Sequence, residues 1–216
     1  MSLFEKLSET EIIQRILKGE KELFEIIVRR YNPYLYKVGR SYNYNHEDTQ
    51  DLMQDTFVDT YKCLPQFEGR SGFKTWIIRI MMNNCFRRKT KAYFKNEIMQ
   101  DEINEQVIPM FSQNHQSTDT ILHARELGTI IEEALSKIPF DYRMVFSLRE
   151  MNEMNLAETA DLLNISEANV KVRLSRAKMM LRSEIEKSYS SKELYEFNLI
   201  YCNTMVEKVM KKINEL

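Results

Sequence analysis

Glycine, proline and cysteine are scarce in this chain of 216 residues, which contains 5, 4 and 3 of them respectively. Because tight turns draw on glycine and proline, so few of them favour long helices over a fold of β-hairpins. The cysteines Cys63, Cys85 and Cys202 are odd in number and far apart, so they predict neither a disulfide framework nor a zinc site. We expect reduced thiols in a cytoplasmic protein.

Long apolar runs and metal-binding patterns are missing as well. No apolar stretch has the length that a bilayer requires, and the first ten residues lack the basic and apolar regions of a secretory signal. His115 and His123 do not have the spacing of metal ligands, and His46 stands alone near a row of aspartates. We therefore expect no membrane insertion, no bound metal and no cofactor.

Acidic residues are absent from two long segments, although the net charge of the whole chain is −1. Residues 70–96 and 168–182 contain basic residues and no acidic one, whereas acidic residues dominate 47–59 and 97–133. Segregation of charge into blocks indicates charged partners. We expect the basic blocks to face phosphates, and the acidic blocks to face basic protein surfaces or to be kept away from DNA.

Apolar residues recur at helical spacing through most of the chain, which predicts an all-α fold. We expect two helical domains, a helical bundle in 1–95 and a helix-turn-helix domain in 122–188. An acidic linker without helical periodicity, 96–121, joins them in this prediction. A C-terminal helical extension, 189–216, follows, and its role stays open.

The first domain is predicted to contain four helices. Two of them fall in 10–40, with an interruption at 31–33, where Tyr-Asn-Pro stands. A third is expected over 46–64, with a proline just after its end. A loop over 66–72 precedes a long helix over about 73–93.

Residues 155–182 have the spacing of a helix-turn-helix motif. A short helix leads into the turn Asn164-Ile165-Ser166, and Ser166 is placed to cap a second helix that begins at Glu167. The basic residues of this second helix suit a recognition helix that lies in the major groove of duplex DNA. The alternative is an ordinary helical hairpin with a solvated basic face, and the absence of acidic residues from 168–182 favours DNA binding.

Residues 66–91 combine aromatic and basic side chains. This mixture suits single-stranded DNA, because bases stack on aromatic rings while cations follow the backbone. For Trp76, which lies on the apolar stripe of its helix, a place in the protein core is the favoured interpretation. The basic cluster is harder to explain by core packing.

Four aspartates, Asp48, Asp51, Asp55 and Asp59, recur every three or four residues and therefore share one face of a helix. A solvated face and a docking face for a basic partner remain open as alternatives. A third hypothesis, a nucleic-acid enzyme that uses these carboxylates with a metal, has less support because no histidine or cysteine cluster accompanies them.

Together these segments resemble an extracytoplasmic-function (ECF) group RNA polymerase sigma factor, over about 10–95 and 130–187. The stretches that carry the resemblance are DLMQDTF at 51–57, FKTWI at 73–77, the residues Ala134, Leu135, Ile138 and Pro139, RMVF at 143–146, and VKVRL at 170–174. Their joint order and spacing are more specific than any single piece.

The resemblance implies an alternative sigma factor, which is not an enzyme. Such a protein binds core RNA polymerase and directs promoter-specific initiation by reading minus-35 and minus-10 elements and assisting DNA melting. In this plan 1–95 is a sigma region 2-like domain and 122–188 a sigma region 4-like domain that faces the polymerase β flap. Because members of the group are commonly held by an anti-sigma factor, we expect such a partner as well.

The resemblance also assigns candidate site residues. Docking on the clamp of the polymerase β′ subunit falls to Asp48, Asp51, Gln54 and Asp55. Binding of melted minus-10 DNA falls to Phe67, Arg70, Ser71, Phe73, Lys74, Trp76, Arg79, Asn83, Arg87 and Arg88. Binding of duplex minus-35 DNA falls to Ser166, Glu167, Asn169, Val170, Lys171, Arg173, Arg176 and Lys178.

Two departures from the family pattern bear on which promoter is read. Arg87 stands where members often have an aspartate, and the sequence at 168–173 is Ala-Asn-Val-Lys-Val-Arg in place of a common Gly-Thr-Val-Lys-Ser-Arg. The alternative function is a polymerase-independent helix-turn-helix regulator, with 1–95 as a sensor or dimerisation domain. That alternative predicts tight binding to duplex DNA without polymerase.

Overall fold

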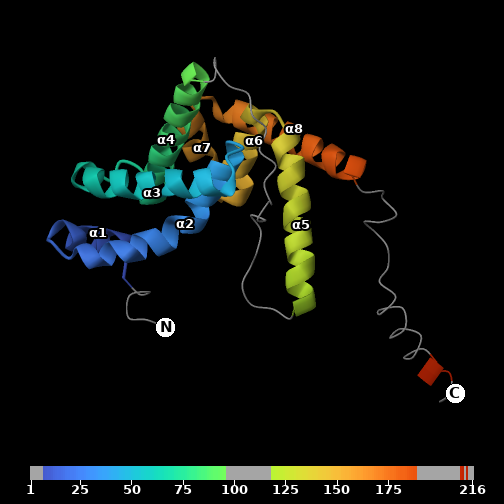
Figure 1. The fold of residues 1–216 in the computed structure, drawn as a ribbon, viewed down its shortest axis with the longest axis horizontal. Helices are drawn as coiled ribbons and strands as arrows, with labels where there is room; N and C mark the ends of the chain where they lie inside the picture. The colour runs from blue at the N-terminus through green and yellow to red at the C-terminus, as the bar shows by residue number, and fades with distance from the viewer. Residues whose placement is uncertain (1–6, 96–117, 189–209, 212, 214–216) are drawn as a thin grey trace.

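The computed structural model describes residues 7–95 and 118–188, together with 210, 211 and 213, and every regular element in these residues is helical (Figure 1). The helices of the first half are α1 (Glu9–Leu17), α2 (Phe24–Ser41), α3 (His46–Cys63) and α4 (Phe73–Lys95), with short 3-10 turns η2 (Lys21–Leu23) and η3 (Leu64–Gln66). Helices α2, α3 and α4 pack against one another. The prediction of an all-α fold is confirmed.

The second half contains α5 (Thr118–Lys137), α6 (Phe140–Phe146), α7 (Leu156–Leu163) and α8 (Glu167–Ser188), with a π-helical turn, η4 (Ser147–Met151), directly after α6. Helix α8 packs against α5, α6 and α7. Helix α5 begins inside the segment 96–121 that was expected to be a linker. The rest of that segment and nearly all of the extension 189–216 lie outside the described residues.

Local signals set the ends of several helices. The side chain of Asn45 accepts a hydrogen bond from the main-chain nitrogen of Asp48 at 2.7 Å, which fixes the start of α3 at the residue predicted. In the same way Ser8 caps α1 through the main-chain nitrogen of Glu11 at 3.3 Å. Because these caps depend on neighbours in sequence, the helix starts could be predicted.

The expected interruption at 31–33 is wrong. Helix α2 runs without a break from Phe24 to Ser41 and carries Pro33 in its interior. Proline in a helix interior costs about 3 kcal/mol. Tyr31 and Leu35, on either side of it, are buried in the core, and this burial offsets the cost.

Helices α2 and α3 approach each other closely at Gly39. A Cβ atom on this residue would lie 2.6 Å from Cγ2 of Thr49 on α3 and 3.0 Å from Cε of Met81 on α4. Glycine therefore allows α2 to cross its two neighbours at this point. The crossing fixes the relative positions of the three helices of the first domain.

The largest hydrophobic cluster joins the two halves of the chain. Met144, Leu148 and Met154, from the second half, are buried in the same cluster as Leu35 and Ile77 from the first. This shared cluster could not be predicted from sequence periodicity, which reports which face of a helix is apolar and not which helix covers it. In this structure η4 and α6 pack on α2, and α7 packs on α4.

Buried polar contacts join the same two halves. The hydroxyls of Ser41 and Ser147 lie 2.6 Å apart, and Nε of Arg143 donates to the main-chain oxygen of Ser41 at 2.7 Å. Arg40 on α2 forms a largely buried ion pair with Glu132 on α5. Because buried polar groups are costly unless they are partnered, these contacts specify one arrangement of the two halves.

Candidate nucleic-acid and polymerase interfaces

The residues predicted to dock on polymerase lie on α3. Asp51, Gln54 and Asp55 are exposed, whereas Asp48 is half-buried and paired with Arg88 of α4. Arg88 also lies 3.9 Å from Asp51. The structure therefore brings a cation predicted for DNA next to carboxylates predicted for polymerase.

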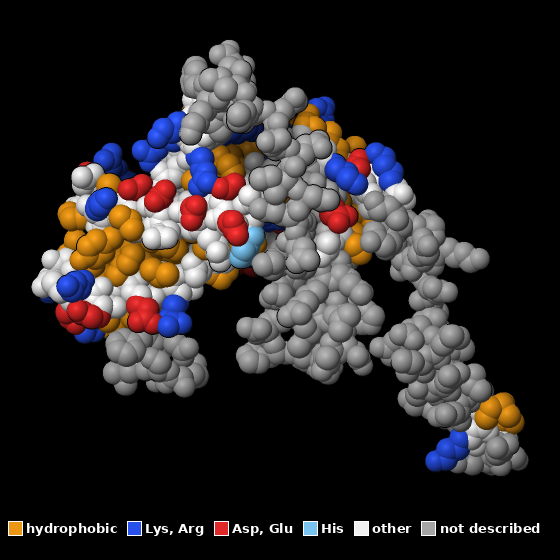
Figure 2. All heavy atoms as spheres, viewed as in Figure 1, with side chains coloured by type: hydrophobic (Ala, Val, Ile, Leu, Met, Phe, Trp, Pro, Cys, Tyr) orange, Lys and Arg blue, Asp and Glu red, His pale blue; other side chains and the backbone are white. Residues whose placement is uncertain are grey.

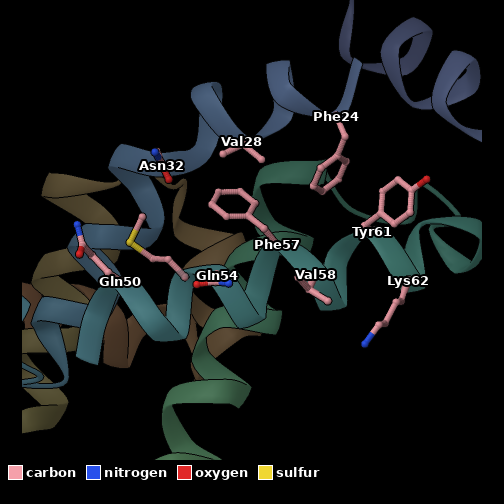
Figure 3. Close-up of a pocket in the computed structure, with 10 residues that line it drawn as sticks. Phe24, Val28, Asn32, Gln50, Gln54, Phe57, Val58, Tyr61 and Lys62 are labelled. Atoms are coloured by element: carbon pink, nitrogen blue, oxygen red, sulfur yellow. The ribbon is translucent and has the colours of Figure 1, made fainter. Parts of the chain in front are cut away.

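An apolar groove runs beside this acidic row. It has a volume of about 600 Å³ and lies between α2 and α3, with Phe24, Val28, Phe57 and Tyr61 in its wall and Gln54 at its edge (Figure 3). Figure 2 shows apolar side chains gathered over α1 to α3, with a row of acidic side chains beside them. Sequence analysis found the acidic row and missed the groove, because Val58 and Tyr61 follow the helical pattern of core residues and yet are exposed.

The loop 66–72 and the start of α4 form a second hollow, of about 440 Å³. Among its lining residues are Phe67, Arg70, Trp76 and Arg79, and also Asp161 from α7. Gly69 takes a φ of 69° at the tip of the loop, which favours glycine there. The hollow combines aromatic rings with cations, as sequence analysis predicted, but α7 also contributes to it.

The aromatic residues of this region form one cluster. The ring centroid of Phe73 lies 5.2 Å from that of Phe67 and 5.4 Å from that of Trp76. Phe73 is fully buried, and its ring anchors the start of α4 in the core, so its assignment to DNA contact stays a prediction. Trp76 is half-buried and reaches both the core and the hollow.

The predicted cations of α4 differ in their surroundings. Lys74 stacks on the ring of Tyr34, with Nζ 3.9 Å from its centroid, and burial lowers the pKa of this lysine. Arg87 lies 3.6 Å from Asp59 and also donates to Asn84. Asn83 is exposed.

The loop also contains an ion pair of its own. Arg70 pairs with Glu68 at 2.6 Å, and both side chains are exposed. Ser71 is half-buried at the wall of the hollow. Glu68 therefore places a negative charge at the mouth of the predicted strand-binding hollow.

Two contacts from α7 reach α4 at the same surface. Nη2 of Arg79 lies 2.5 Å from Oδ2 of Asp161, and Oγ1 of Thr75 donates to Oε1 of Glu158 at 3.0 Å. Sequence analysis missed these partners, which lie more than eighty positions further along the chain. The only hint in the sequence was that the short helix before the turn carries two acidic residues, Glu158 and Asp161.

Helices α7 and α8 form the predicted helix-turn-helix. Asn164 has a φ of 52° and ends α7, and the hydroxyl of Ser166 accepts from the main-chain nitrogen of Asn169 at 3.2 Å. The prediction that Ser166 caps α8 is confirmed. Val170 is fully buried and packs with residues of α7 and α8, and its assignment as a DNA-contacting residue stays a prediction.

The basic face of α8 is partly paired within the domain. Arg173 lies 3.3 Å from Asp141 on α6, and Lys178 lies 3.0 Å from Glu150. Nη1 of Arg176 lies 3.5 Å from the hydroxyl oxygen of Tyr142. Lys171 and Glu167 are exposed near the start of the helix, and Asn169 is half-buried.

The described parts of the chain contain neither a cluster of metal ligands nor a membrane-spanning helix. No group of three or more His, Cys, Asp or Glu residues there is placed to hold a metal ion. Across the same residues, no helix combines the length and apolar character needed to cross a membrane.

Two family models match the chain. Sigma-70 region 2 matches residues 27–93, and Sigma-70, region 4 matches residues 129–181, together more than half of the sequence. The first match covers most of α2, all of α3 and nearly all of α4, and the second covers α6, α7 and the helix-turn-helix. The chain belongs to the sigma-70 family of RNA polymerase sigma factors.

Curated relatives place it within that family. The chain is 22% identical over 185 residues to the ECF RNA polymerase sigma-E factor of Haemophilus influenzae, covering 84% of this chain and 97% of the relative. It is 26% identical over 179 residues to the ECF RNA polymerase sigma factor SigW of Bacillus subtilis, covering 80% and 94%. The predicted ECF group is confirmed, and with it an alternative sigma factor, a transcription factor and not an enzyme.

Solved structures show the same fold. CnrH, in complex with the cytosolic domain of CnrY, matches with a TM-score of 0.59 and 22% identity, over 82% of this chain and 97% of that one. The sigma factor RpoE of Bartonella quintana, in complex with the anti-sigma factor NepR, matches with a TM-score of 0.59 and 19% identity, over 76% and 96%.

Proposed function

We propose that this alternative sigma factor binds core RNA polymerase through α3, reads a minus-35 element with α8, and captures melted minus-10 DNA at the loop 66–72 and α4. The observation that carries the proposal is the second hollow, where Phe67 and Trp76 stand beside Arg70 and Arg79. Aromatic rings beside cations bind unstacked bases and their phosphates. Such a site suits a strand that has already left the duplex.

Polymerase binding is assigned to the exposed carboxylates of α3 and the groove beside them. Asp51 and Asp55 are exposed and the groove wall is apolar, so the surface offers both charge and buried area to a basic, amphipathic partner. The clamp helices of the β′ subunit are the proposed partner, and the β flap is proposed to meet the second domain. The site of action is then the cytoplasm, where the polymerase is.

Promoter recognition is proposed to begin with the duplex. The exposed start of α8, with Glu167 and Lys171, is the part of a recognition helix that enters the major groove. Binding energy is distributed over several small contacts, so the free protein binds DNA weakly. Melting follows because captured bases at α4 favour the open strand.

An anti-sigma partner is also proposed. The matched structures of CnrH and RpoE are complexes, with CnrY and with the anti-sigma factor NepR respectively. This chain shares their fold, and its groove between α2 and α3 is an exposed apolar surface of the kind that protein partners cover.

The polymerase surface is tested with charge reversals on α3. Purified protein is mixed with bacterial core polymerase and the complex is separated by size. The chain is expected to bind stably, and the double variant Asp51→Arg/Asp55→Arg is expected to bind at least tenfold more weakly. The control Glu22→Lys, at a residue of η2 that neither belongs to α3 nor lines the groove, is expected to bind as the parent does. If the chain does not bind core but binds duplex DNA specifically by itself, the polymerase-independent regulator replaces the proposal.

A further inference from the structure

The groove between α2 and α3 has dimensions that suit one short helix. Its lining residues on α3 run from Gln50 to Lys62, which is a rise of about 18 Å along the helix axis (Figure 3). Phe57, Val58 and Tyr61 supply much of its apolar surface, and the last two are 46% and 42% exposed. A row of exposed apolar side chains of this length is typical of a surface that a partner covers.

Acidic residues follow one edge of this groove. Asp51 and Asp55 come directly after the lining residues Gln50 and Gln54 on α3, and both are exposed. Figure 2 shows the acidic side chains in a row beside the apolar surface. The groove therefore favours a helix that has one apolar face with basic residues beside it.

The segment 205–213 of the same chain has this character. Its apolar residues have the spacing of one helical face: Met205, Val206, Val209, Met210 and Ile213. Three lysines and one glutamate make up the rest of the segment. The structure describes 210, 211 and 213 as helical, and Met210 and Ile213 are 48% and 52% exposed. One chain thus contains an apolar groove with an acidic edge and an apolar helix face with basic neighbours.

We propose that residues 205–213 dock as an amphipathic helix in the groove between α2 and α3 of their own chain, with their lysines beside Asp51 and Asp55. A helix of this length is about 13 Å long and fits the part of the groove that α3 lines. Its apolar face then covers Phe57, Val58 and Tyr61.

Covalent connection favours this segment over a second copy of the chain or a separate protein. Residues 189–204 connect α8 to the segment and span at most about 55 Å when extended, which is about twice the length of α3. A segment attached to its own site acts at an effective concentration on the order of millimolar. Docking therefore needs only a low intrinsic affinity, and a tighter partner can displace the segment.

The docked segment covers the surface that the proposed function assigns to core polymerase, so the two compete. The docking is independent of that assignment, whereas its effect on polymerase binding rests on the proposed function. The apparent affinity for polymerase is reduced by the fraction of molecules in which the groove is free. Residues 205–213 thereby regulate access to α3.

Photo-crosslinking of the purified full-length protein tests the docking. The crosslinking variants are Tyr61→p-benzoylphenylalanine and Val58→p-benzoylphenylalanine, at two exposed positions in the groove. Phe86→p-benzoylphenylalanine, at an exposed residue of α4 that does not line the groove, is the matched control. After irradiation, monomers are separated from dimers under denaturing conditions and their crosslinked peptides are identified by mass spectrometry. We expect crosslinks to 205–213 within monomers from Tyr61 and Val58, and none from Phe86.

A pair of substitutions in the segment completes this test. Ile213→Asp places a charge on the apolar face and is expected to lower the crosslinking yield by about fivefold or more. Asn214→Asp makes the same charge change at the next residue, outside the apolar spacing, and should stay within about twofold of the parent. Equal yields for these two variants would overturn the proposal. Absence of crosslinks to 205–213 from both groove positions would overturn it in favour of a separate protein, and crosslinks found only in dimers would do so in favour of a second copy.

Binding to core polymerase tests the competition and separates it from the proposed function. Ile213→Asp is expected to bind core about fivefold more tightly than the parent, and Asn214→Asp to bind as the parent does. If the parent binds core and these two variants bind it equally, the competition is wrong. If crosslinks form within monomers but no protein binds core, the docking stands and the proposed function fails. If the parent directs transcription and no crosslinks to 205–213 form, the docking is wrong and the sigma factor function stands.

Discussion

Arg143 on α6 donates a hydrogen bond from Nε to the main-chain oxygen of Ser41 on α2, at 2.7 Å. Its Nη1 donates to the main-chain oxygens of Leu135, Ser136 and Ile138 around the end of α5. Burial lowers the pKa of this arginine from its usual value. One side chain therefore caps a helix of the second domain and ties that domain to the first.

Replacing this arginine is expected to destabilise the protein. Arg143→Met removes four hydrogen bonds and leaves buried carbonyl groups unsatisfied, at a cost of about 3 kcal/mol in the free energy of unfolding. A lysine cannot reach all of these oxygens, so the free energy of unfolding of Arg143→Lys should lie between those of the parent and Arg143→Met. Unfolding in urea provides the values. Arg29→Met, at an exposed pair on α2, should change stability by less than about 0.5 kcal/mol, and equal effects at the two positions would contradict the account.

The crossing of α2 and α3 gives a second prediction. In Gly39→Ala the new methyl group meets Cγ2 of Thr49 at 2.6 Å, so the free energy of unfolding should fall by about 1–3 kcal/mol. Thr49→Ser removes Cγ2 and keeps the hydroxyl that donates to the main-chain oxygen of Asn45. The double variant should therefore recover part of the loss. A simple sum of the two single effects would show that the methyl clash is not the cause.

Cys85 gives a prediction about pH. Burial raises the pKa of its thiol from 9.0 to about 12, so the unfolded chain releases this proton first as the pH rises. The contribution of the protonated thiol to the free energy of unfolding is fully present below pH 9. It is lost at about 1.4 kcal/mol per pH unit between pH 9 and pH 12. The contribution of the thiol is obtained by comparing the free energies of unfolding in urea of the parent and Cys85→Ala at pH 8 and pH 10. At pH 8 the thiol should also resist alkylation until the protein unfolds, whereas modification in the folded protein would contradict its burial.

Substitution of two adjacent residues of α8, Val170 and Lys171, should affect different properties of the protein. Lys171 is exposed, so Lys171→Ala should leave stability unchanged and weaken promoter binding by the holoenzyme, with the salt dependence of binding reduced by about one counterion. Val170 is fully buried, so Val170→Ala should lower the free energy of unfolding by about 1–2 kcal/mol. Thermal unfolding and electrophoretic mobility shift of the holoenzyme measure the two effects. Loss of promoter binding without loss of stability in Val170→Ala would reverse the assignment.

Sequence reasoning succeeded where the determinants are local. The cap at Ser166, the start of α3 after Asn45 and the acidic row on α3 follow from residues a few positions apart. It was wrong at Pro33 because burial of Tyr31 and Leu35, which depends on distant helices, outweighs a local preference. The helix-turn-helix was found because its turn and cap are contiguous in sequence.

Long-range pairing could not be predicted. Ser41 and Ser147 are 106 positions apart, and neither residue type signals a buried partner. Asp161 is an ordinary exposed residue on its helix, and its ion pair with Arg79 arises only because the fold brings α7 beside α4. Phe73 and Val170 lie in the family motifs and were assigned to DNA, and their burial could not be predicted from membership of a motif.

The most direct measurement of the central claim is promoter-specific transcription by core polymerase reconstituted with this protein. A library of promoter fragments is transcribed with core alone, with core plus the parent, and with core plus Asp51→Arg/Asp55→Arg. The account predicts new run-off transcripts from a defined set of promoters with the parent, and none with core alone or with the α3 variant. Transcripts that are the same in all three reactions would contradict it.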